Sequence, residues 1–442
     1  MYKISVFLLK FSFMTSIQTL YQLFLESGKV TTDTRNCPKG SIFFALKGDN
    51  FDGNLFASKA LENGCSHAVV DNPEVIEGSP YILVEDVLST LQALAKEHRK
   101  HLVIPIIGIT GTNGKTTTKE LMAAVLSKKY QVLYTQGNLN NHIGVPLTLL
   151  RIGREHEMAI IEMGANHPGE IGFLCDIALP NHGLITNIGK AHLEGFGSFQ
   201  GVIQTKSELY RHLKAHQGHA FVNRDNDLLF DLSSELETTF YGTTNTAHMC
   251  GGLVSCEPFL KVQWQDSHQK FQQAQTQLIG AYNLENVLAA ICVGQYFRVS
   301  SAQIVEALEA YAPGNNRSQF KQTENNALII DAYNANPTSM MAAIDNFKNI
   351  GNPHKAVILG SMKELGDQSM EEHQKVIQAL KLAQVDLVYL IGKEFEACGS
   401  PFETFVSTNA FLDFLQQHPI QSHLILIKGS RSNQLETLIP HL

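Results

Sequence analysis

The chain has 442 residues, 44% of them hydrophobic and 17% charged, and its formal net charge is −8. This length exceeds one ordinary core, so it predicts two to four domains, and the composition excludes a disordered chain and favours a soluble globular enzyme. The negative balance, with no basic block to offset it, argues against a nucleic-acid-binding surface.

The first segment, MYKISVFLLKFSFM, is apolar but short. It lacks a small-residue cleavage site and cannot span a bilayer, so we expect neither a signal peptide nor membrane insertion. The simple explanation is an over-called start, so we expect Met14 rather than Met1 to be the first residue. A helix should follow it, capped by Ser16. Its apolar stripe consists of Ile17, Leu20, Tyr21 and Phe24.

Short strands and helices alternate over the next part of the chain, which predicts a compact α/β unit. The expected strands are 41–48, 67–71 and 81–86, and the expected helices are 55–64 and 87–102.

A second unit begins at 103–110, a strand of β-branched residues that leads into a glycine-rich loop. Apolar strands alternating with helices predict a parallel sheet with its sites at the carboxyl ends of the strands. The polar stretch 235–280 predicts an antiparallel edge. The other expected elements are strands 157–164 and 182–189 and helices 115–130, 283–297 and 301–311.

A turn-rich stretch, 312–319, has the composition of a linker. A second doubly wound pattern follows it, so the predicted fold class is α/β with three domains. Its expected strands are 326–333, 355–362, 385–392 and 422–430.

The loop GITGTNGKTTTKE (108–120) carries the clearest chemical signal. The common phosphate-loop pattern would place a glycine at Ile109, but a strand still opens into small residues and then a helix. Loop amides and the helix N-terminus can bind a phosphate, Lys115 can pair with the β- and γ-phosphates, and a threonine hydroxyl can ligate Mg²⁺. The alternative, a glycine turn beside an ordinary surface lysine, fits this setting poorly.

Other polar residues follow strands. Glu162 interrupts an apolar run and is placed for Mg²⁺, although a solvated loop acid is the alternative. His192 is either a ligand or a structural histidine. Asp331, in DAYNANPTS (331–339), can hold a ribose hydroxyl or simply belong to a turn. KGSRS (428–432) is either an anion-binding turn or a plain connection.

Two features carry little signal of their own. By spacing alone, Lys206 is a surface residue. The seven cysteines are scattered without a CxxC pair, which indicates a reducing compartment rather than a disulfide framework or a zinc knuckle.

Taken in order, seven motifs resemble the Mur ligases of peptidoglycan synthesis, and the resemblance covers essentially the whole chain after Met14. They are GITGTNGKTTTKE, GNLNNHIGVPLTLL, IEMGANHPGEI, TNIGKAHLEGFGS, GAYNLENVLAA, DAYNANPTSM and LGSMKELG.

Within this family the pattern D-x-Y-N-A-N-P resembles the MurF type. The MurE type has D-Y-A-H-T-P and a D-N-P-R signature, whereas the only Asp-Asn-Pro here, at 71–73, precedes Glu74. Folylpolyglutamate synthases share the central loop but not the stretch 31–56, which resembles the family's UDP-binding domain.

The resemblance implies a UDP-MurNAc-peptide-binding domain (14–102), a central ATP-binding P-loop domain (103–312) and a Rossmann-like C-terminal ligase domain (313–442). It implies a cytoplasmic ligase, with nothing demanding more than a monomer, that uses ATP to join D-Ala-D-Ala to UDP-MurNAc-tripeptide through an acyl phosphate. A MurE-type ligase that adds a diamino acid to UDP-MurNAc-dipeptide is the alternative. A nucleotide-binding scaffold without turnover, or a simple ATPase switch, is an alternative of another class.

The resemblance also assigns roles to residues. Lys115, Lys206 and His192 would be catalytic, and Lys206 would be carbamylated. Two Mg²⁺ ions would be held by Thr116, Glu162, His192 and Lys206. ATP would contact Gly111, Thr112, Asn113, Gly114, Lys115, Thr116, Thr117, Asn283, Asn286, Arg317 and Asp331. The other substrates would contact Asp33, Thr34, Arg35, Lys47, Asp52, Gly53, Asn138, Asn140, Asn141, Asn334 and Asn336.

Overall fold

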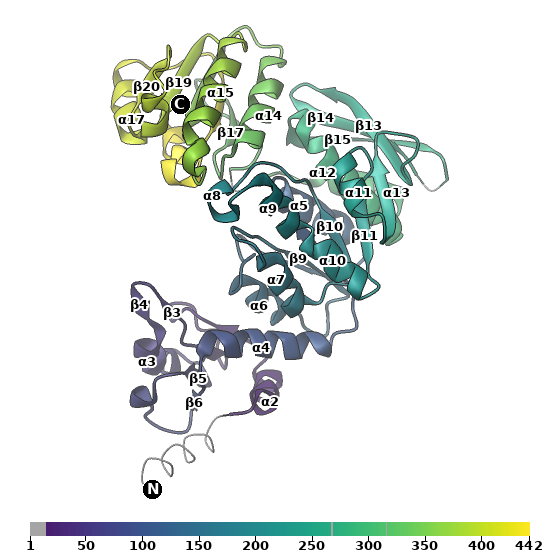
Figure 1. Cartoon of the computed structure of the whole chain (residues 1–442), viewed down its shortest axis with the longest axis vertical. Helices are drawn as coiled ribbons and strands as arrows, with labels where there is room; N and C mark the ends of the chain where they lie inside the picture. Colours follow the sequence, from purple (N-terminus) through teal and green to yellow (C-terminus); the bar gives the residue numbers. More distant parts are fainter. Residues whose placement is uncertain (1–14, 267, 315) are drawn as a thin grey trace. The chain divides into compact units, whose positions relative to one another are not determined.

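The computed structural model describes residues 15–442 except 267 and 315, so the predicted start at Met14 lies outside the described residues. The described chain, coloured in Figure 1 from its amino-terminal part in purple to its carboxyl-terminal part in yellow, divides into two compact units. The first unit contains the described residues up to 108 together with 130–164 and 171–182. The second contains 109–129, 165–170 and 183–442.

The first unit opens with the helix that the sequence predicted, α2 (Ile17–Ser27). The Ser16 side chain accepts a hydrogen bond from the backbone N–H of Thr19, and Leu20, Tyr21 and Phe24 are buried. A local capping signal and an apolar stripe therefore suffice to define this helix.

A four-stranded sheet follows, in the order β1-β2-β5-β6, with all its neighbouring strands parallel. The predicted strand 41–48 is split, because after β2 the chain turns into a small antiparallel hairpin of β3 and β4. The strands are β1 (Val30–Thr31), β2 (Ile42–Phe44), β3 (Lys47–Gly48), β4 (Phe51–Asp52), β5 (His67–Val70) and β6 (Tyr81–Leu83).

Helices α3 (Ala57–Glu62) and α4 (Val87–Lys100) match the two that were predicted here. Asp86 caps α4, and three basic residues occupy its last turn, where the helix dipole favours them. The remaining elements of this part are the 3₁₀ turns η1 (Gly53–Phe56) and η2 (Pro73–Val75), then β8 (Val132–Tyr134), α6 (Gly144–Leu149), β9 (Met158–Glu162) and α7 (Glu170–Ala178).

The strand before the glycine loop, β7 (Ile106–Thr110), belongs to a nine-stranded sheet ordered β15-β14-β13-β12-β11-β10-β7-β9-β8. Strands β13 to β15 pair antiparallel at its edge, as predicted. The antiparallel part begins later than predicted, because β12 pairs parallel with both β11 and β13. These strands are β10 (His182–Ile185), β11 (His219–Asn223), β12 (Glu237–Gly242), β13 (Met249–Cys256), β14 (Phe259–Gln265) and β15 (Phe271–Ile279).

Several helices of this region lie between residues 190 and 234, for which no helix or strand was predicted from the sequence. Farther along the chain, helix α12 is largely buried, and it packs against α5. The bounds are α5 (Lys115–Leu126), α8 (Leu193–Phe196), α9 (Phe199–Lys206), α10 (Glu208–Ala215), α11 (Asp227–Leu232), η3 (Ala281–Asn283), α12 (Leu284–Tyr296) and α13 (Ser301–Ala310).

The last part of the chain forms a six-stranded sheet, ordered β16-β17-β21-β18-β19-β20. Its strands are parallel except β16, which is antiparallel to β17. The strands are β16 (Gln319–Gln322), β17 (Ala327–Asp331), β18 (Lys355–Gly360), β19 (Leu387–Ile391), β20 (Glu403–Phe405) and β21 (Leu424–Lys428).

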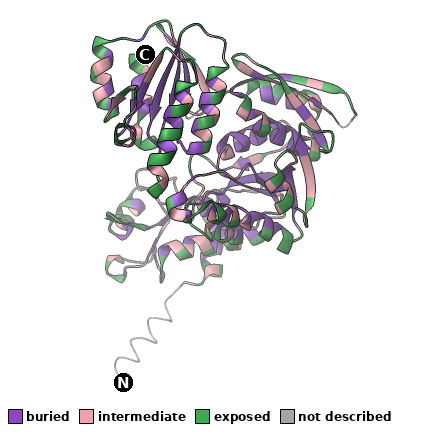
Figure 2. Cartoon of the chain, turned by 45° about the horizontal axis from the view of Figure 1, so that its top comes forward, coloured by how far each residue is buried: buried purple, intermediate pink, exposed green. Residues whose placement is uncertain are grey.

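Alternate residues of these strands enter two separate cores, which is the doubly wound arrangement that was predicted. Ile329 packs with residues of α14 and α15, whereas Ile330 packs with residues of α17. The strands are accordingly coloured mostly as buried in Figure 2. The helices are α14 (Pro337–Lys348), η4 (Gly366–Gln368), α15 (Ser369–Lys381), α16 (Lys393–Ala397), α17 (Thr408–Gln417), η5 (Arg431–Asn433) and η6 (Leu435–His441).

None of the helices in the described part of the chain combines the length and the apolarity that crossing a membrane requires.

Candidate functional site

The glycine loop joins β7 to α5 at two positions that only glycine fits. Gly111 has φ +141°, and a Cβ there would lie 2.0 Å from Thr186 Oγ1. Gly114 has φ +78°, and a Cβ there would lie 2.4 Å from Asn286 Oδ1. Backbone in this conformation costs other residues energy, so both glycines are required by local geometry. The predicted strand–loop–helix is confirmed as a structure.

Residues from the end of β10 hold this loop in place. The N–H of Thr112 donates to the Asn187 carbonyl over 2.9 Å, and the N–H of Asn113 donates to Asn187 Oδ1 over 3.0 Å. Thr186 Oγ1 donates to the Asn113 carbonyl over 2.6 Å. Lys115 Nζ folds back over the loop and donates to the carbonyls of Gly111 and Thr112. The loop is therefore a braced turn with a cation above it.

Helix α12 supports the same loop through two buried asparagines. Asn286 Nδ2 donates to Asn283 Oδ1 over 2.8 Å, and Asn286 Oδ1 accepts from Thr118 Oγ1 over 3.0 Å. Asn283 Nδ2 donates to the Ile279 carbonyl over 2.8 Å. Thr116 and Thr117, directly before Thr118 in α5, are also buried. Through Thr118, Asn283 and Asn286 therefore stabilise the start of α5, directly after the glycine loop.

His192 and Glu364 form a hydrogen-bonded pair, through the imidazole Nδ1 and a carboxylate oxygen. His192 has φ +51°, a left-handed conformation that is uncommon outside glycine. Burial lowers the pKa of His192, and the positive charges of Lys115 and Lys206 act in the same direction, although Glu364 opposes them. With Nδ1–H donating to Glu364, the neutral ring presents Nε2 as an electron-pair donor.

Lys206 is buried, with a relative exposure of only 2%, so the surface position expected from its spacing is wrong. Its Nζ lies 3.5 Å from the Ala165 carbonyl and 5.5 Å from the centre of the Phe196 ring. Burial lowers the pKa of Lys206 to about 7, with the charge of Lys115 as the second cause. The amine is therefore substantially uncharged near neutral pH.

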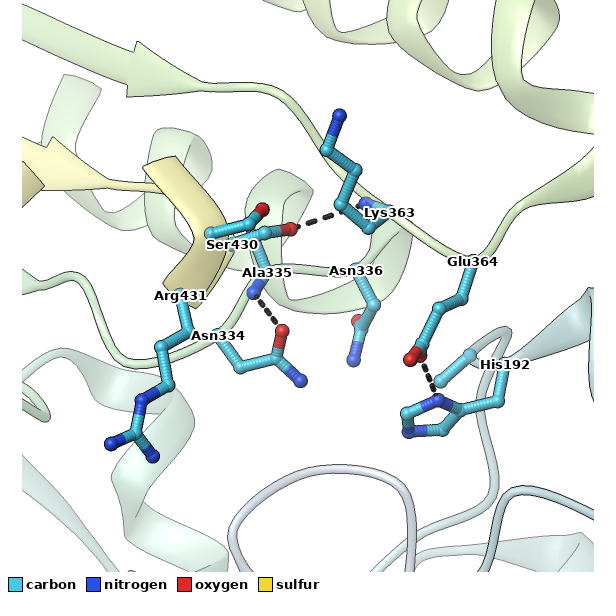
Figure 3. A pocket seen from close by; sticks show the side chains of 10 residues that line it. His192, Asn334, Ala335, Asn336, Lys363, Glu364, Ser430 and Arg431 are labelled. Carbon is cyan, nitrogen blue, oxygen red and sulfur yellow. Dashed lines mark hydrogen bonds and ion pairs between the residues drawn. The ribbon is translucent and has the colours of Figure 1, made fainter. Parts of the chain in front are cut away.

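A pocket of about 210 Å³ lies beside the His192–Glu364 pair. In Figure 3 the side chains of Asn334 and Arg431 border one side of it and those of His192 and Glu364 the other. The backbone N–H of Lys363 donates to Ser430 Oγ over 3.1 Å, which ties two strand-end turns together. The full lining is Ala191, His192, Asn334, Ala335, Asn336, Lys363, Glu364, Ser430, Arg431 and Ser432.

The loop after β17 also meets the glycine loop. Asn336 caps α14 by accepting from the N–H of Ser339, and its Nδ2 donates to Asn113 Oδ1 over 2.7 Å. Pro337 occupies the first position of α14, where a missing N–H costs nothing. The Asn and Pro residues of this motif therefore act both as turn formers and as a contact to the phosphate loop.

The guanidinium groups of two arginines lie over the ring of Tyr333, and one of them, that of Arg431, also lines the pocket. The guanidinium of Arg317 lies 3.6 Å from the centre of the Tyr333 ring, and that of Arg431 lies 5.3 Å from it. Asp331, at the end of β17, accepts a hydrogen bond from the buried Lys428 Nζ over 2.5 Å. Cations at these positions suit an anionic ligand.

In the first unit, Glu162 ends β9 with an exposure of 2%, and Asn140 Nδ2 donates to its Oε1 over 2.9 Å. The alternative of a solvated loop acid is therefore wrong. Asn141 Oδ1 accepts from the N–H groups of Ile143 and Gly144, so its side chain shapes the start of α6. Asn138 is exposed.

Two loops with charged residues follow strands β1 and β2 of the amino-terminal sheet. Arg35 donates to Asp33 over 2.8 Å, and this hydrogen bonding lowers the pKa of Asp33 to about 2. Lys47 pairs with Asp71 over 2.8 Å. Asp52 caps η1 at the Asn54 N–H, and a Cβ at Gly53 would lie 2.4 Å from the Leu46 carbonyl. The carbonyl of Thr34 accepts from Asn63 Nδ2 over 2.8 Å. Both loops are tightly fixed.

Sequence reasoning gave no role to Glu364, Lys363 or Asp71, and it left Lys428 open. The first two lie in LGSMKELG, a motif that was noticed but not interpreted. Their signal was present as charged residues a few positions after a buried strand. Asp71 follows a buried strand in the same way.

Models of known protein families match three successive parts of the chain. Residues 28–123 match the model of the Mur ligase family, catalytic domain. Residues 109–294 match the Mur ligase middle domain, and residues 316–431 match the Mur ligase, glutamate ligase domain.

Similar curated proteins include the UDP-N-acetylmuramoyl-tripeptide–D-alanyl-D-alanine ligases of Bacillus subtilis and Escherichia coli. They are 35% and 34% identical to this chain, and in each case 93% of this chain and 92% of the relative are covered. A crystal structure of MurF from Acinetobacter baumannii is 32% identical, with a TM-score of 0.82 over 93% of this chain and 92% of that one.

MurF from Thermotoga maritima, solved in complex with ADP, is 27% identical, with a TM-score of 0.82 over 94% of this chain and 97% of that one. A UDP-N-acetylmuramoyl-L-alanyl-D-glutamate–2,6-diaminopimelate ligase is only 16% identical, with a TM-score of 0.53, and shares the fold alone. By the family models and by relatives that align over nearly its whole length, this chain belongs to the Mur ligase family.

Proposed function

We propose that this chain is an ATP-dependent amide ligase that joins D-alanyl-D-alanine to UDP-N-acetylmuramoyl-tripeptide. The supporting observation is the near full-length similarity to ligases of that name, together with a glycine loop fixed in a phosphate-binding form. The similarity to a diaminopimelate ligase is much weaker, so the MurE-type alternative has less support.

The proposed reaction has two steps. A carboxylate oxygen at the end of the tripeptide attacks the γ-phosphorus of ATP, the bond to the β-phosphate oxygen breaks, and ADP leaves. The amine of D-Ala-D-Ala then attacks the carbonyl carbon of this acyl phosphate and loses a proton, and inorganic phosphate departs as the amide forms. The main electrostatic demand is to bring a carboxylate and a triphosphate together.

Lys115 meets part of this demand. Its Nζ already lies over the loop carbonyls of Gly111 and Thr112, so a phosphate bound by the loop amides would meet a positive charge there. We assign phosphate binding to residues 111–117. We assign binding of the rest of the nucleotide to Asn283, Asn286, Arg317 and Asp331, as the family resemblance implies. For the first two, bracing of the loop supports the assignment.

Mg²⁺, when bound, would neutralise phosphate charge. The residues of the second unit fit such a role: Thr116 is at the start of α5, and His192 has a neutral ring with Nε2 available. Glu162 keeps its metal-site role as a prediction, supported by the burial of a carboxylate at the end of β9. Two ions are proposed, as the resemblance implies.

We propose that Lys206 is carbamylated. Only an uncharged amine attacks CO₂, and a pKa of about 7 provides one at neutral pH. The amine nitrogen bonds to the carbon of CO₂ and releases a proton, and the resulting carbamate is an anion that would remove the repulsion from Lys115 and could supply an oxygen ligand for Mg²⁺. This explains why a lysine is buried here without a carboxylate in hydrogen-bonding contact among the described residues.

We assign binding of the UDP-sugar and of the peptides to residues in loops that are held by hydrogen bonds and ion pairs. For the UDP-sugar these are Asp33, Thr34, Arg35, Lys47, Asp52 and Gly53. For the peptide they are Asn138, Asn140, Asn141, Asn334 and Asn336. The domain boundaries at 102 and 312 are part of the same proposal, supported by the separate amino- and carboxyl-terminal sheets. A monomer in the cytoplasm, where ATP and UDP-activated precursors occur together, is the proposed form.

The test measures ADP release by the purified chain with ATP and Mg²⁺ while each other substrate is omitted in turn. ADP should form over many turnovers only when UDP-MurNAc-tripeptide and D-Ala-D-Ala are both present, because without D-Ala-D-Ala the reaction stops at the acyl phosphate. Release that ignores D-Ala-D-Ala but needs UDP-MurNAc-dipeptide and a free diamino acid would establish the MurE type. Binding of the UDP-sugar peptide without any ADP release would indicate a scaffold.

A further inference from the structure

Three potential metal ligands gather at the amino-terminal edge of the C-terminal sheet. His354, Asp386 and His423 are the residues directly before β18, β19 and β21. These strands are parallel and adjacent, so their first residues lie side by side. One ligand atom from each residue lies within 4.8 Å of the ligand atoms of the other two.

The sheet itself fixes the positions of these residues. The N–H of Leu424 donates to the His354 carbonyl over 2.9 Å, and the N–H of Asp386 donates to the Lys355 carbonyl over 3.0 Å. The N–H of Lys355 in turn donates to Asp386 Oδ2 over 2.7 Å, which orients the carboxylate. The backbone of the cluster is thus preformed, and the side chains that need to adjust are exposed in His354 and Asp386 and partly buried in His423.

The ring of His423 is held in the form that suits a ligand. Its Nδ1 lies 2.6 Å from the carbonyl oxygen of Gln421, which can only accept, so Nδ1 carries the hydrogen. The neutral ring therefore has its electron pair on Nε2. A backbone carbonyl on the other nitrogen is the usual support for a metal-binding imidazole.

The carboxylate is charged under ordinary conditions. The Lys355 N–H donates a hydrogen bond to Oδ2 of Asp386, which favours the charged form of the carboxylate. Asp386 thus supplies a negative charge beside two imidazoles, whose rings are 5.6 Å apart between centres.

We propose that His354, Asp386 and His423 form a binding site for a divalent transition metal ion, with Zn²⁺ as the representative ligand. Two imidazoles and one carboxylate suit Zn²⁺ and its neighbours, whereas Mg²⁺ and Ca²⁺ require oxygen ligands. Metal–nitrogen bonds of about 2.0 Å require the three side chains to move closer together. A fourth position is left for water.

This site is separate from the proposed ligase site. The pocket residues Asn334 and Ser430 follow the carboxyl ends of β17 and β21, whereas the cluster precedes the amino ends of the strands. An ion there would link the starts of three strands and so act on the stability of the C-terminal sheet. The Mg²⁺-dependent ADP release proposed above should not depend on it.

The test uses the untagged full-length chain, stripped with a chelator and titrated with ZnCl₂ by calorimetry. Wild type should bind Zn²⁺ at this site and melt at a higher temperature with it. His354→Gln, His423→Gln and Asp386→Asn should each weaken that binding by more than about tenfold and lose the thermal shift. MgCl₂ and CaCl₂ should produce neither effect.

Two matched controls make the result specific. His418→Gln removes an exposed histidine of the same sheet domain, whose ring stacks on Phe414, and should leave Zn²⁺ binding unchanged. His216→Gln disrupts the His212–His216 ring stack at the end of α10, a second close pair of histidines, and should also leave Zn²⁺ binding unchanged. Binding that survives all three cluster substitutions, or that is lost in His216→Gln instead, would overturn the proposal. Unchanged melting of each metal-free variant excludes unfolding as the cause.

Discussion

Lys428 and Asp331 form an ion pair across two neighbouring strands, with Nζ and Oδ2 2.5 Å apart. The Lys428 side chain is 2% exposed and that of Asp331 is 17% exposed. Lys428 Nζ also lies 3.5 Å from the Asn334 carbonyl, so the pair links the strand ends to the wall of the pocket. A charge this well buried depends on its partner.

We expect Asp331→Ala to lower the free energy of unfolding by about 3–5 kcal/mol, because it leaves the Lys428 charge buried and unpaired. Urea denaturation followed by circular dichroism measures the change. Replacing both partners, in Asp331→Leu with Lys428→Met, should recover much of the loss because no charge then remains buried.

The matched control is Asp345→Ala, whose carboxylate pairs with Lys348 but is 67% exposed. An exposed pair contributes about 0–1 kcal/mol, so this variant should stay close to wild type. Equal losses in Asp331→Ala and Asp345→Ala would show that burial of the pair is not what matters.

The second prediction concerns the cation over the glycine loop. Lys115→Met should reduce kcat for ADP release by about 100-fold or more, because the charge that faces the transferred phosphate is lost. Steady-state kinetics with saturating ATP measure it. Lys381→Met, at an exposed position in the last turn of α15, should retain full activity. A Lys115→Met enzyme with normal kcat would remove this lysine from the proposed chemistry.

The third prediction concerns Lys206. Lys206→Ala should abolish ADP release, and added short carboxylates should restore part of it by supplying the missing anion. Wild type depleted of CO₂ should regain activity when bicarbonate is added. Since only the uncharged amine reacts, and the pKa is about 7, this recovery should be strong at pH 8 and weak at pH 6.

Two results would contradict the Lys206 proposal. Full activity of Lys206→Ala without rescue would return this residue to a packing role. Recovery that does not change between pH 6 and pH 8 would show that the protonation of this amine does not control the step.

Much of this arrangement could be predicted from the sequence, because short-range signals determine it. The Ser16 cap and the Asn336-Pro337 start of α14 act within a few residues, and the glycines at 111 and 114 allow the positive φ of their own loop. The residues that were missed depend on distant partners. His192 meets Glu364 across 172 positions of sequence, and no local pattern encodes that pairing.

Lys206 shows the same limit in another form. Its spacing in α9 is that of a surface residue, and its burial comes from elements packed around the helix end, including Phe196 and Ala165. Helical periodicity describes one helix face, whereas burial of a single long side chain depends on what covers that face.

The last prediction concerns pH and the fully buried His373, next to the motif that carries Glu364. Its Nδ1 donates to the Ser369 carbonyl over 2.7 Å, and its Nε2 accepts from the N–H of Met362 over 3.0 Å. A protonated ring could not accept that bond, so the folded chain requires the neutral form. Burial, the largest cause, lowers the pKa of His373.

The sign of the pH effect follows from this. The unfolded chain takes up the proton at about pH 6.5, before the folded chain does, so the free energy of unfolding falls as pH drops below about 6.5. His373→Leu should be less stable than wild type at pH 7.5 but lose less on going to pH 5.5. Urea denaturation at both values measures this, and the exposed His418→Leu should keep the wild-type dependence. An unaltered dependence in His373→Leu would assign the acid sensitivity to other buried histidines, such as His98, whose pKa burial also lowers.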